Sequence, residues 1–132
     1  MLINVDSKKI TKVLPEVIEK YNPNGKSIFD EKMTEKLKEP EHLKLTYKDT
    51  IGRSKIDTNN HLNNLYYLDY AIESLPEDVY QKEDFNNIEI MYKTAVKYKD
   101  KIKCFYAKEG DKQVIVIKSE NLEHINSIIK MW

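Results

Sequence analysis

The sequence predicts an α+β fold in which an antiparallel β-sheet wraps around one central helix. Three observations predict this class: one segment has the apolar spacing of a buried helix, several short runs alternate like strands, and the last of these runs are joined by short connections. Short connections join antiparallel strands, because a parallel pair needs a long crossover. A chain of 132 residues fits one such domain and can bury a sizeable core.

The central helix is expected within residues 63–75. Asn63 or Asn64 can cap its first turn, because an asparagine side chain accepts a hydrogen bond from a free amide there. Pro76 ends the helix, since the residue before a proline is pushed out of the helical region. The apolar residues that we expect on its buried stripe recur at a 3-4-3 spacing and are Leu65, Leu68, Ile72 and Leu75, with Tyr67 and Ala71 widening the stripe.

The first strand of the main domain is expected at residues 43–51, where apolar and polar residues alternate. Gly52 ends this strand, and a loop then leads toward the helix. The period of two predicts one half-buried face, made of Leu43, Leu45, Tyr47 and Ile51.

Four more strands are expected after the helix and a loop at residues 76–87, namely residues 87–97, 101–108, 113–118 and 122–131. The link at residues 98–100 is tight, which predicts that the first two of these strands pair with each other. In the loop, we expect Val79, Tyr80 and Phe85 to turn inward. The first of the four strands would present one face made of Ile88, Ile90, Tyr92, Thr94 and Val96.

Residues 1–40 are expected to form an N-terminal strand, a short helix and a linker that precede the main domain at residues 41–132. The first residues predict a hairpin around Asp6-Ser7. Residues 14–21 predict a helix with a proline in its first turn. The remainder of this segment is highly charged and is expected to be linker.

The composition argues against several classes of partner. Hydrophobic residues make up 40% of the chain and charged residues 33%, which is typical of a globular domain. Lys plus Arg equals Asp plus Glu, and the basic residues are scattered, so nucleic acid is not an expected partner. No apolar run reaches the roughly 18 residues that span a bilayer, and no signal peptide is visible.

The single cysteine, Cys104, allows no internal disulfide and agrees with a reducing, cytoplasmic location. Cys104 lies in an alternating apolar run, so we expect a small buried residue and not a nucleophile. The three histidines, His42, His61 and His124, lack the spacing of metal ligands. The sequence therefore predicts no metal site and no cofactor.

The candidate site lies just before the helix, where Asp57, Asn59 and His61 occupy positions i, i+2 and i+4. If this segment is extended, the three side chains share one side; if it is a tight turn, they cluster at the mouth of the helix. A carboxylate, an amide and an imidazole together can activate water. The simpler interpretation is that Asp and Asn form a turn by bonding their own backbone, beside an ordinary surface histidine.

This segment resembles the signature of the acyl-ACP thioesterases of plants and bacteria. The resemblance covers about residues 42–132 and is to the C-terminal half of the bacterial type; residues 71–76 and 88–92 also look like that family. It implies a hotdog fold. The matching motif reads Asp57-x-Asn59-x-His61-Leu62-Asn63-Asn64-x-x-Tyr67-Leu68.

The resemblance also implies the site: catalytic Asp57, Asn59 and His61, with substrate contacts from Asn63, Asn64 and Tyr67. Our hypothesis is that His61 polarises water or the thioester carbonyl, Asp57 orients or activates its partner, and Asn59 positions water or donates to the oxyanion. Free amides at the helix start would add to oxyanion stabilisation. The implied substrates are fatty acyl thioesters on acyl carrier protein.

Three positions depart from the family pattern. Ala95 stands where an acidic residue is usual, Val96 where plant members have Cys, and Lys55 where an Asp is common. Alanine and valine can neither transfer a proton nor attack a carbonyl. Glu89 is a poor substitute for an acid at position 95, since six residues of extended strand span about 20 Å. We therefore expect weak or absent hydrolysis by this chain alone.

Three functions stay open: hydrolysis of fatty acyl-ACP, binding of an acyl chain or carrier by a non-catalytic hotdog half, and hydrolysis of acyl-CoA. Full-length members of the family carry two hotdog halves in one chain, and residues 1–40 resemble the tail of the first half. The sequence is thus either a fragment of such a protein or a single-hotdog variant. Because a lone hotdog leaves a sheet edge open, we expect a homodimer or pairing with another hotdog half.

Overall fold

The computed structural model describes residues 2–4, 6–7, 9–22, 24–26 and 36–132 of the chain. The chain divides into two compact units, Met1–Glu35 and Lys36–Trp132. In the first unit, strands β1 (Leu2–Ile3) and β2 (Ile10–Thr11) pair antiparallel, which confirms the predicted hairpin. Helix α1 (Pro15–Tyr21) follows with proline at its first position, as predicted. Most of the expected linker, residues 27–35, lies outside the described residues.

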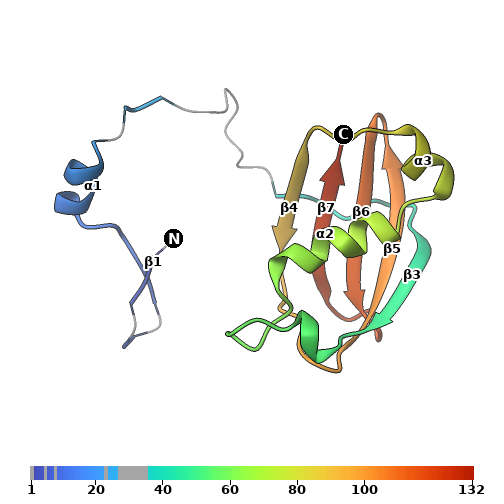
Figure 1. Ribbon diagram of the computed structural model, residues 1–132, viewed down its shortest axis with the longest axis horizontal. Coiled ribbons are helices and arrows are strands. Elements are labelled where there is room, and N and C mark those ends of the chain that lie inside the picture. The colour runs from blue at the N-terminus through green and yellow to red at the C-terminus, as the bar shows by residue number, and fades with distance from the viewer. Residues whose placement is uncertain (1, 5, 8, 23, 27–35) are drawn as a thin grey trace. The chain divides into compact units, whose positions relative to one another are not determined.

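The second unit is a five-stranded antiparallel sheet with helix α2 lying across one face (Figure 1). The strand order is β3-β5-β6-β7-β4. No helix in the described parts of the chain is long and apolar enough to cross a bilayer. The strands are β3 (Lys44–Thr50), β4 (Ile88–Tyr92), β5 (Lys101–Glu109), β6 (Lys112–Ser119) and β7 (Ile125–Met131), and the helices are the 3-10 turn η1 (Arg53–Lys55), α2 (Asn64–Glu73) and α3 (Glu77–Lys82).

Both faces of the sheet are covered, which explains the continuous apolar run in β6. On the inner face, Ile115, Ile117 and Ile129 pack in one cluster with the buried side chains of α2. Cys104 belongs to this cluster and is fully buried, as predicted. On the outer face, a second cluster is covered by the segment that leads into β3, and its members include Val114, Val116, Ile128, Leu37 and Leu43.

The buried face of α2 differs from the predicted stripe. Leu65 is 70% exposed and Ile72 is 44% exposed, so the prediction is wrong for these two residues. It is confirmed for Tyr67 and Ala71, which are buried, and for Leu75, which packs against the inner cluster. Both candidate faces have helical spacing, and the sheet selects between them. Small Ala71 lets the helix backbone approach the sheet, and aromatic rings fill the space on either side. The residues of α2 that are buried against the sheet are Tyr67, Tyr70 and Ala71.

A β-bulge in β3 makes the predicted single face of residues 43–51 wrong. The register with β5 shifts between Leu45 and Tyr47. An inserted residue reverses the alternation of side chains along a strand. Leu43 therefore packs in the outer cluster, whereas Tyr47 packs against the inner one.

The predicted pairing of residues 87–97 with residues 101–108 is also wrong. β4 ends at Tyr92 and pairs with β7 at the edge of the sheet, because β5 already has β3 and β6 as neighbours. The amides of Lys93 and Thr94 then both donate to the carbonyl of Asn126, which bends the chain away from the ladder. The predicted common face consequently breaks after Tyr92, and the chain crosses the end of the sheet before β5 begins.

Residues 76–87, expected to be a loop, contain helix α3. Its first turn carries two acidic residues and its last turn a lysine, and both charges suit the helix dipole. Phe85 packs against the inner cluster as expected, whereas Tyr80 is 58% exposed.

Candidate functional site

Asp57 to His61 form a tight turn, which decides between the two geometries left open by the sequence. The turn closes a very short hairpin, in which Ile56 and Leu62 form an isolated antiparallel bridge. The amide of Asp57 donates to the carbonyl of His61 at 2.8 Å. Asn60 adopts the left-handed conformation (φ 62°) that such a turn needs and that asparagine tolerates. We call residues 57–61 the motif loop.

The carboxylate of Asp57 organises the motif loop. Its Oδ1 accepts hydrogen bonds from the amide of Asn59 at 2.8 Å and from the amide of His61 at 3.2 Å. The bond from the His61 amide lowers the pKa of Asp57 most, and the Asn59 amide and side chain lower it further. Asp57 therefore forms the turn and brings the side chains of Asn59, which is exposed, and His61, which is half-buried, to the same loop.

The three residues predicted to contact substrate, Asn63, Asn64 and Tyr67, lie at the start of α2. The Asn63 side chain caps the helix by accepting from the amide of Leu65 at 3.0 Å, as predicted, and the Asn63 carbonyl accepts from the amide of Tyr66. Asn64 begins the helix and is exposed. Tyr67 is buried and packs edge-on against Tyr92, with 5.1 Å between ring centroids. In the described structure, Asn63 is thus a cap and Tyr67 a core residue.

Two backbone hydrogen bonds fix the motif loop against the rest of the unit. The amide of Leu62 donates to the carbonyl of Val96 at 2.8 Å, and the amide of Asn63 donates to the carbonyl of Lys55 at 2.9 Å. The first bond brings position 95 beside the motif loop, because Ala95 is covalently joined to Val96. Ala95 is exposed there and lies in the β4–β5 connection, outside any strand.

Three side chains from separate elements form a closed hydrogen-bonded set, which we call the triad: Asp49 from β3, Lys55 from η1 and Tyr70 from α2. Lys55 Nζ donates to Asp49 Oδ2 at 2.9 Å and to the Tyr70 hydroxyl at 2.8 Å. The Tyr70 hydroxyl in turn donates to Asp49 Oδ2 at 2.7 Å. The Lys55 carbonyl also accepts a hydrogen bond from the amide of Asn63, the N-cap of α2. The triad therefore anchors the segment that leads into the motif loop.

The triad shifts the pKa of each member. Burial alone would raise the pKa of Asp49, but hydrogen bonds from Tyr70 and Lys55 outweigh it and lower that pKa. Burial raises the pKa of Tyr70 to about 12, and the bond to Asp49 adds to this. Burial would lower the pKa of Lys55, yet its hydrogen bonds to Tyr70 and Asp49 raise it. Lys55 therefore serves as a paired cation at the position where the resemblance leads us to expect an Asp.

Sequence reasoning noticed Lys55 only as a departure and missed its two partners. The three positions have no shared period and come from a strand, a 3-10 turn and a helix. No local signal connects them, because the contact exists only once α2 lies on the sheet.

We expect the triad to make the free energy of unfolding fall at alkaline pH. A raised folded-state pKa contributes stability that is complete below the unfolded value of 10 and is lost as the pH rises toward the folded value of about 12. The free energy of unfolding should therefore fall by on the order of 2 kcal/mol over this range. Denaturant unfolding at several pH values measures the fall, and Tyr70→Phe, which cannot ionise, should make it shallower; the raised pKa of Lys55 accounts for a remaining fall in the same direction. An equally steep fall in Tyr70→Phe would assign the effect to other groups.

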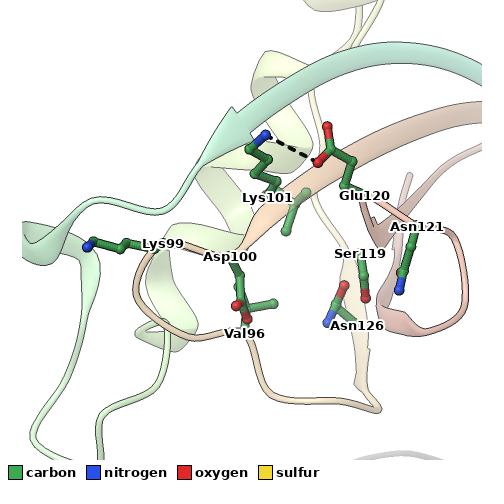
Figure 2. A pocket seen from close by; sticks show the side chains of 9 residues that line it. Val96, Lys99, Asp100, Lys101, Ser119, Glu120, Asn121 and Asn126 are labelled. Atoms are coloured by element: carbon green, nitrogen blue, oxygen red, sulfur yellow. Dashed lines mark ion pairs between the residues drawn. The ribbon is translucent and has the colours of Figure 1, made fainter.

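A hollow of about 440 Å³ lies between the β4–β5 connection and the β6–β7 turn (Figure 2). Its lining is mostly polar and charged, and it includes Lys101 and Glu120, which form an ion pair at 3.5 Å. The Oδ1 atom of Asn126, which is 4% exposed, finds no hydrogen-bond partner among the described residues. A hollow of this character suits water and polar groups, and it does not suit an acyl chain.

Comparison with known proteins places this arrangement in a family. Residues 35–131 match the family model of the acyl-ACP thioesterase C-terminal domain. The chain belongs to this family. Among curated members, the chloroplastic oleoyl-acyl carrier protein thioesterase of Coriandrum sativum is 25% identical over 132 residues, which cover 89% of this chain and 34% of that protein. The chain thus spans about a third of the length of the curated relatives it matches.

Solved structures of acyl-ACP thioesterases share the fold. An acyl-ACP thioesterase from Bacteroides thetaiotaomicron has a TM-score of 0.66 and 20% identity, covering 98% of this chain and 51% of that one. The 12:0-ACP thioesterase from Umbellularia californica has a TM-score of 0.68 and 14% identity, with the same coverage. These likenesses confirm the hotdog fold, with one antiparallel sheet packed on one central helix. The family model and the curated relatives do not favour the non-catalytic and acyl-CoA alternatives.

Proposed function

We propose that the chain forms the C-terminal half of a fatty acyl-ACP thioesterase, which hydrolyses acyl-ACP to a free fatty acid and the carrier thiol. In this proposal, residues 41–132 are the hotdog domain and residues 1–40 are the tail of a preceding half. The observation that carries it is the motif loop, whose residues resemble the family signature, fall within the matched residues 35–131 and come directly before the central helix. We expect the reaction to belong to fatty acid synthesis in the cytoplasm, a reducing compartment that suits the free thiol of Cys104.

The motif loop can supply most of the required chemistry. Hydrolysis needs a water made nucleophilic, a stabilised oxyanion and a proton for the leaving thiolate. In our proposal His61 takes the proton from water as it attacks the thioester carbonyl and gives that proton to the carrier thiolate as the C–S bond breaks. Asp57 holds the loop in place through the His61 amide. Asn59 positions the water or donates to the oxyanion. Asn63 already engages the amides of Leu65 and Tyr66, so the Asn64 amide is our candidate for a second oxyanion donor.

We expect the chain to hydrolyse medium and long acyl-ACP slowly, and His61→Ala and Asn59→Ala each to abolish what activity remains. Neither side chain belongs to the buried clusters, so both variants should unfold at the wild-type midpoint. Release of carrier thiol measures the rate, and thermal unfolding provides the control. Turnover comparable with that of full-length relatives, or activity that survives both changes, would contradict the proposed roles.

Pairing with a second hotdog, in another copy or another half, is part of the proposal. The stripe of α2 that faces away from the sheet carries exposed Leu65 and Ile72, an apolar surface on the single central helix. Among the described strands, β7 alone pairs with β4, so β4 forms an edge of the sheet in this part of the chain. Both features support an association that buries this side of the unit.

We expect light scattering to give a mass above that of one chain, and Leu65→Asp with Ile72→Asp to reduce it to a single chain. A charge on an apolar contact surface is desolvated at a cost of several kcal/mol, enough to dissociate a typical complex. Tyr80→Asp is the control, because Tyr80 on α3 is 58% exposed, a value between those of Leu65 and Ile72. A monomeric wild-type chain at high concentration would contradict self-pairing.

A further inference from the structure

The neutral total charge conceals a strong asymmetry between the two ends of the hotdog unit. Residues 69–89, which include α3, carry seven acidic residues and one basic residue, whereas residues 93–103 carry five lysines and one aspartate. α3 lies at the end of the sheet where β4 begins, and the β4–β5 connection lies at the opposite end (Figure 1). The lysines of the β4–β5 connection therefore lie together at one end of the fold, whereas other basic residues, such as Lys108 and Lys112 beside the β5–β6 turn, lie elsewhere.

Two of the cations at this end are held on one aromatic ring. The guanidinium of Arg53 lies 5.1 Å from the centroid of the Tyr98 ring, and the ammonium of Lys99 lies 5.4 Å from it. Lys97 is exposed on the same connection. Figure 2 shows the Lys99 side chain pointing away from the other labelled side chains. We call Arg53, Lys97 and Lys99 the basic rim, a set of preorganised positive charges around Tyr98.

Lys99 occupies a backbone position that favours glycine or asparagine. Its φ of 69° is left-handed, in a turn closed by the Asp100 amide on the Lys97 carbonyl and by the Lys97 amide on Asp100 Oδ2. A lysine in this conformation is strained. Strain at an exposed charged residue points to a role for its side chain, because nothing in the turn itself requires a lysine.

The basic rim adjoins the motif loop. The Lys99 amide donates to the carbonyl of Ile51, and the Ile51 amide donates to the carbonyl of Asp100. The same connection holds the motif loop through the bond from Leu62 to Val96. A partner seated on the basic rim would therefore reach the start of α2, where the proposed chemistry occurs.

We propose that the basic rim is the docking surface for an acidic acyl carrier protein. This inference rests on the proposed function, which makes a carrier-linked thioester the substrate. Such a carrier presents the phosphodiester of its pantetheine arm and, if acidic, carboxylates around it, and both complement the rim. Complementary charge outside the reacting centre mainly raises the association rate and weakens with salt.

The test is direct binding of holo acyl carrier protein, measured by calorimetry at low and high salt, which needs no turnover. Lys97→Glu with Lys99→Glu should weaken binding by at least about tenfold at low salt, and salt should remove most of the difference. Lys82→Glu with Lys108→Glu, two exposed lysines outside the rim, makes the same change in total charge and should leave binding unchanged. Equal weakening in both double variants, or none in the first, would overturn the proposal.

Lys99→Gly separates docking from folding. It removes the charge and relieves the left-handed strain, so the unfolding midpoint should rise while carrier binding weakens. A variant that is more stable yet binds the carrier as well as wild type would overturn a role for Lys99.

Acyl-pantetheine, which lacks both protein and phosphate, distinguishes this inference from the proposed function. The rim variants should process it as the wild type does. If neither the wild type nor an Ala95→Glu variant hydrolyses it while the rim variants still lose carrier binding, the proposed function fails and the docking surface stands. If acyl-pantetheine is hydrolysed and the rim variants bind the carrier as well as wild type, the proposed function stands and the docking surface fails.

Discussion

Ala95→Glu is expected to raise acyl-ACP hydrolysis by about 10²-fold or more, which is the range that a positioned acid or base contributes. The family resemblance implies an acidic residue at this position, and the bond from the Leu62 amide to the Val96 carbonyl brings Ala95 near the end of the motif loop. Ala95 is exposed, so a longer side chain fits without repacking the core. The rate of carrier thiol release from acyl-ACP measures the gain.

Two companion variants decide what the gain means. Ala95→Gln has the size of glutamate but cannot transfer a proton, so it should stay near the wild-type rate. His61→Ala in the Ala95→Glu background should return the rate to baseline, because both groups would act on the same water. An equal gain from Gln would assign the effect to positioning and not to proton transfer. No gain in rate from Ala95→Glu would show that the low activity is not caused by a missing acidic side chain at position 95.

Tyr67→Ala is expected to lower the free energy of unfolding by about 3–5 kcal/mol, whereas Leu65→Ala should change it by no more than about 0.5 kcal/mol. Tyr67 is 3% exposed and packs edge-on against Tyr92, so its removal leaves a cavity beneath α2. Leu65 is 70% exposed and has little contact to lose. Urea unfolding measures both changes.

These measurements belong at low protein concentration, where pairing contributes little to stability. Leu68→Ala, on a half-buried residue of the same helix, should fall between the two values. If Leu65→Ala lowered the free energy of unfolding by several kcal/mol, Leu65 would be buried, as predicted from the sequence. A small loss in Tyr67→Ala would show that the ring is not held in the core.

The candidate site was only partly predictable. The motif residues were identified from their order in the chain, and the Asn63 cap from the chemistry of its side chain. Whether the motif loop was extended or a tight turn stayed open, since it depends on the bridge between Ile56 and Leu62. The triad was missed, because its members meet only when β3, η1 and α2 are assembled.

The sequence by itself determined the fold class, the position of the central helix and the positions of β5, β6 and β7, since these depend on periodicity and turn chemistry within short windows. Tertiary structure decided which face of α2 is buried, how β3 changes face and where β4 pairs. It also decided that Ala95 and the basic rim lie beside the motif loop. The physical reason is the same throughout: local patterns tell which residues can be buried together, and only contacts between distant segments choose among the arrangements that satisfy them.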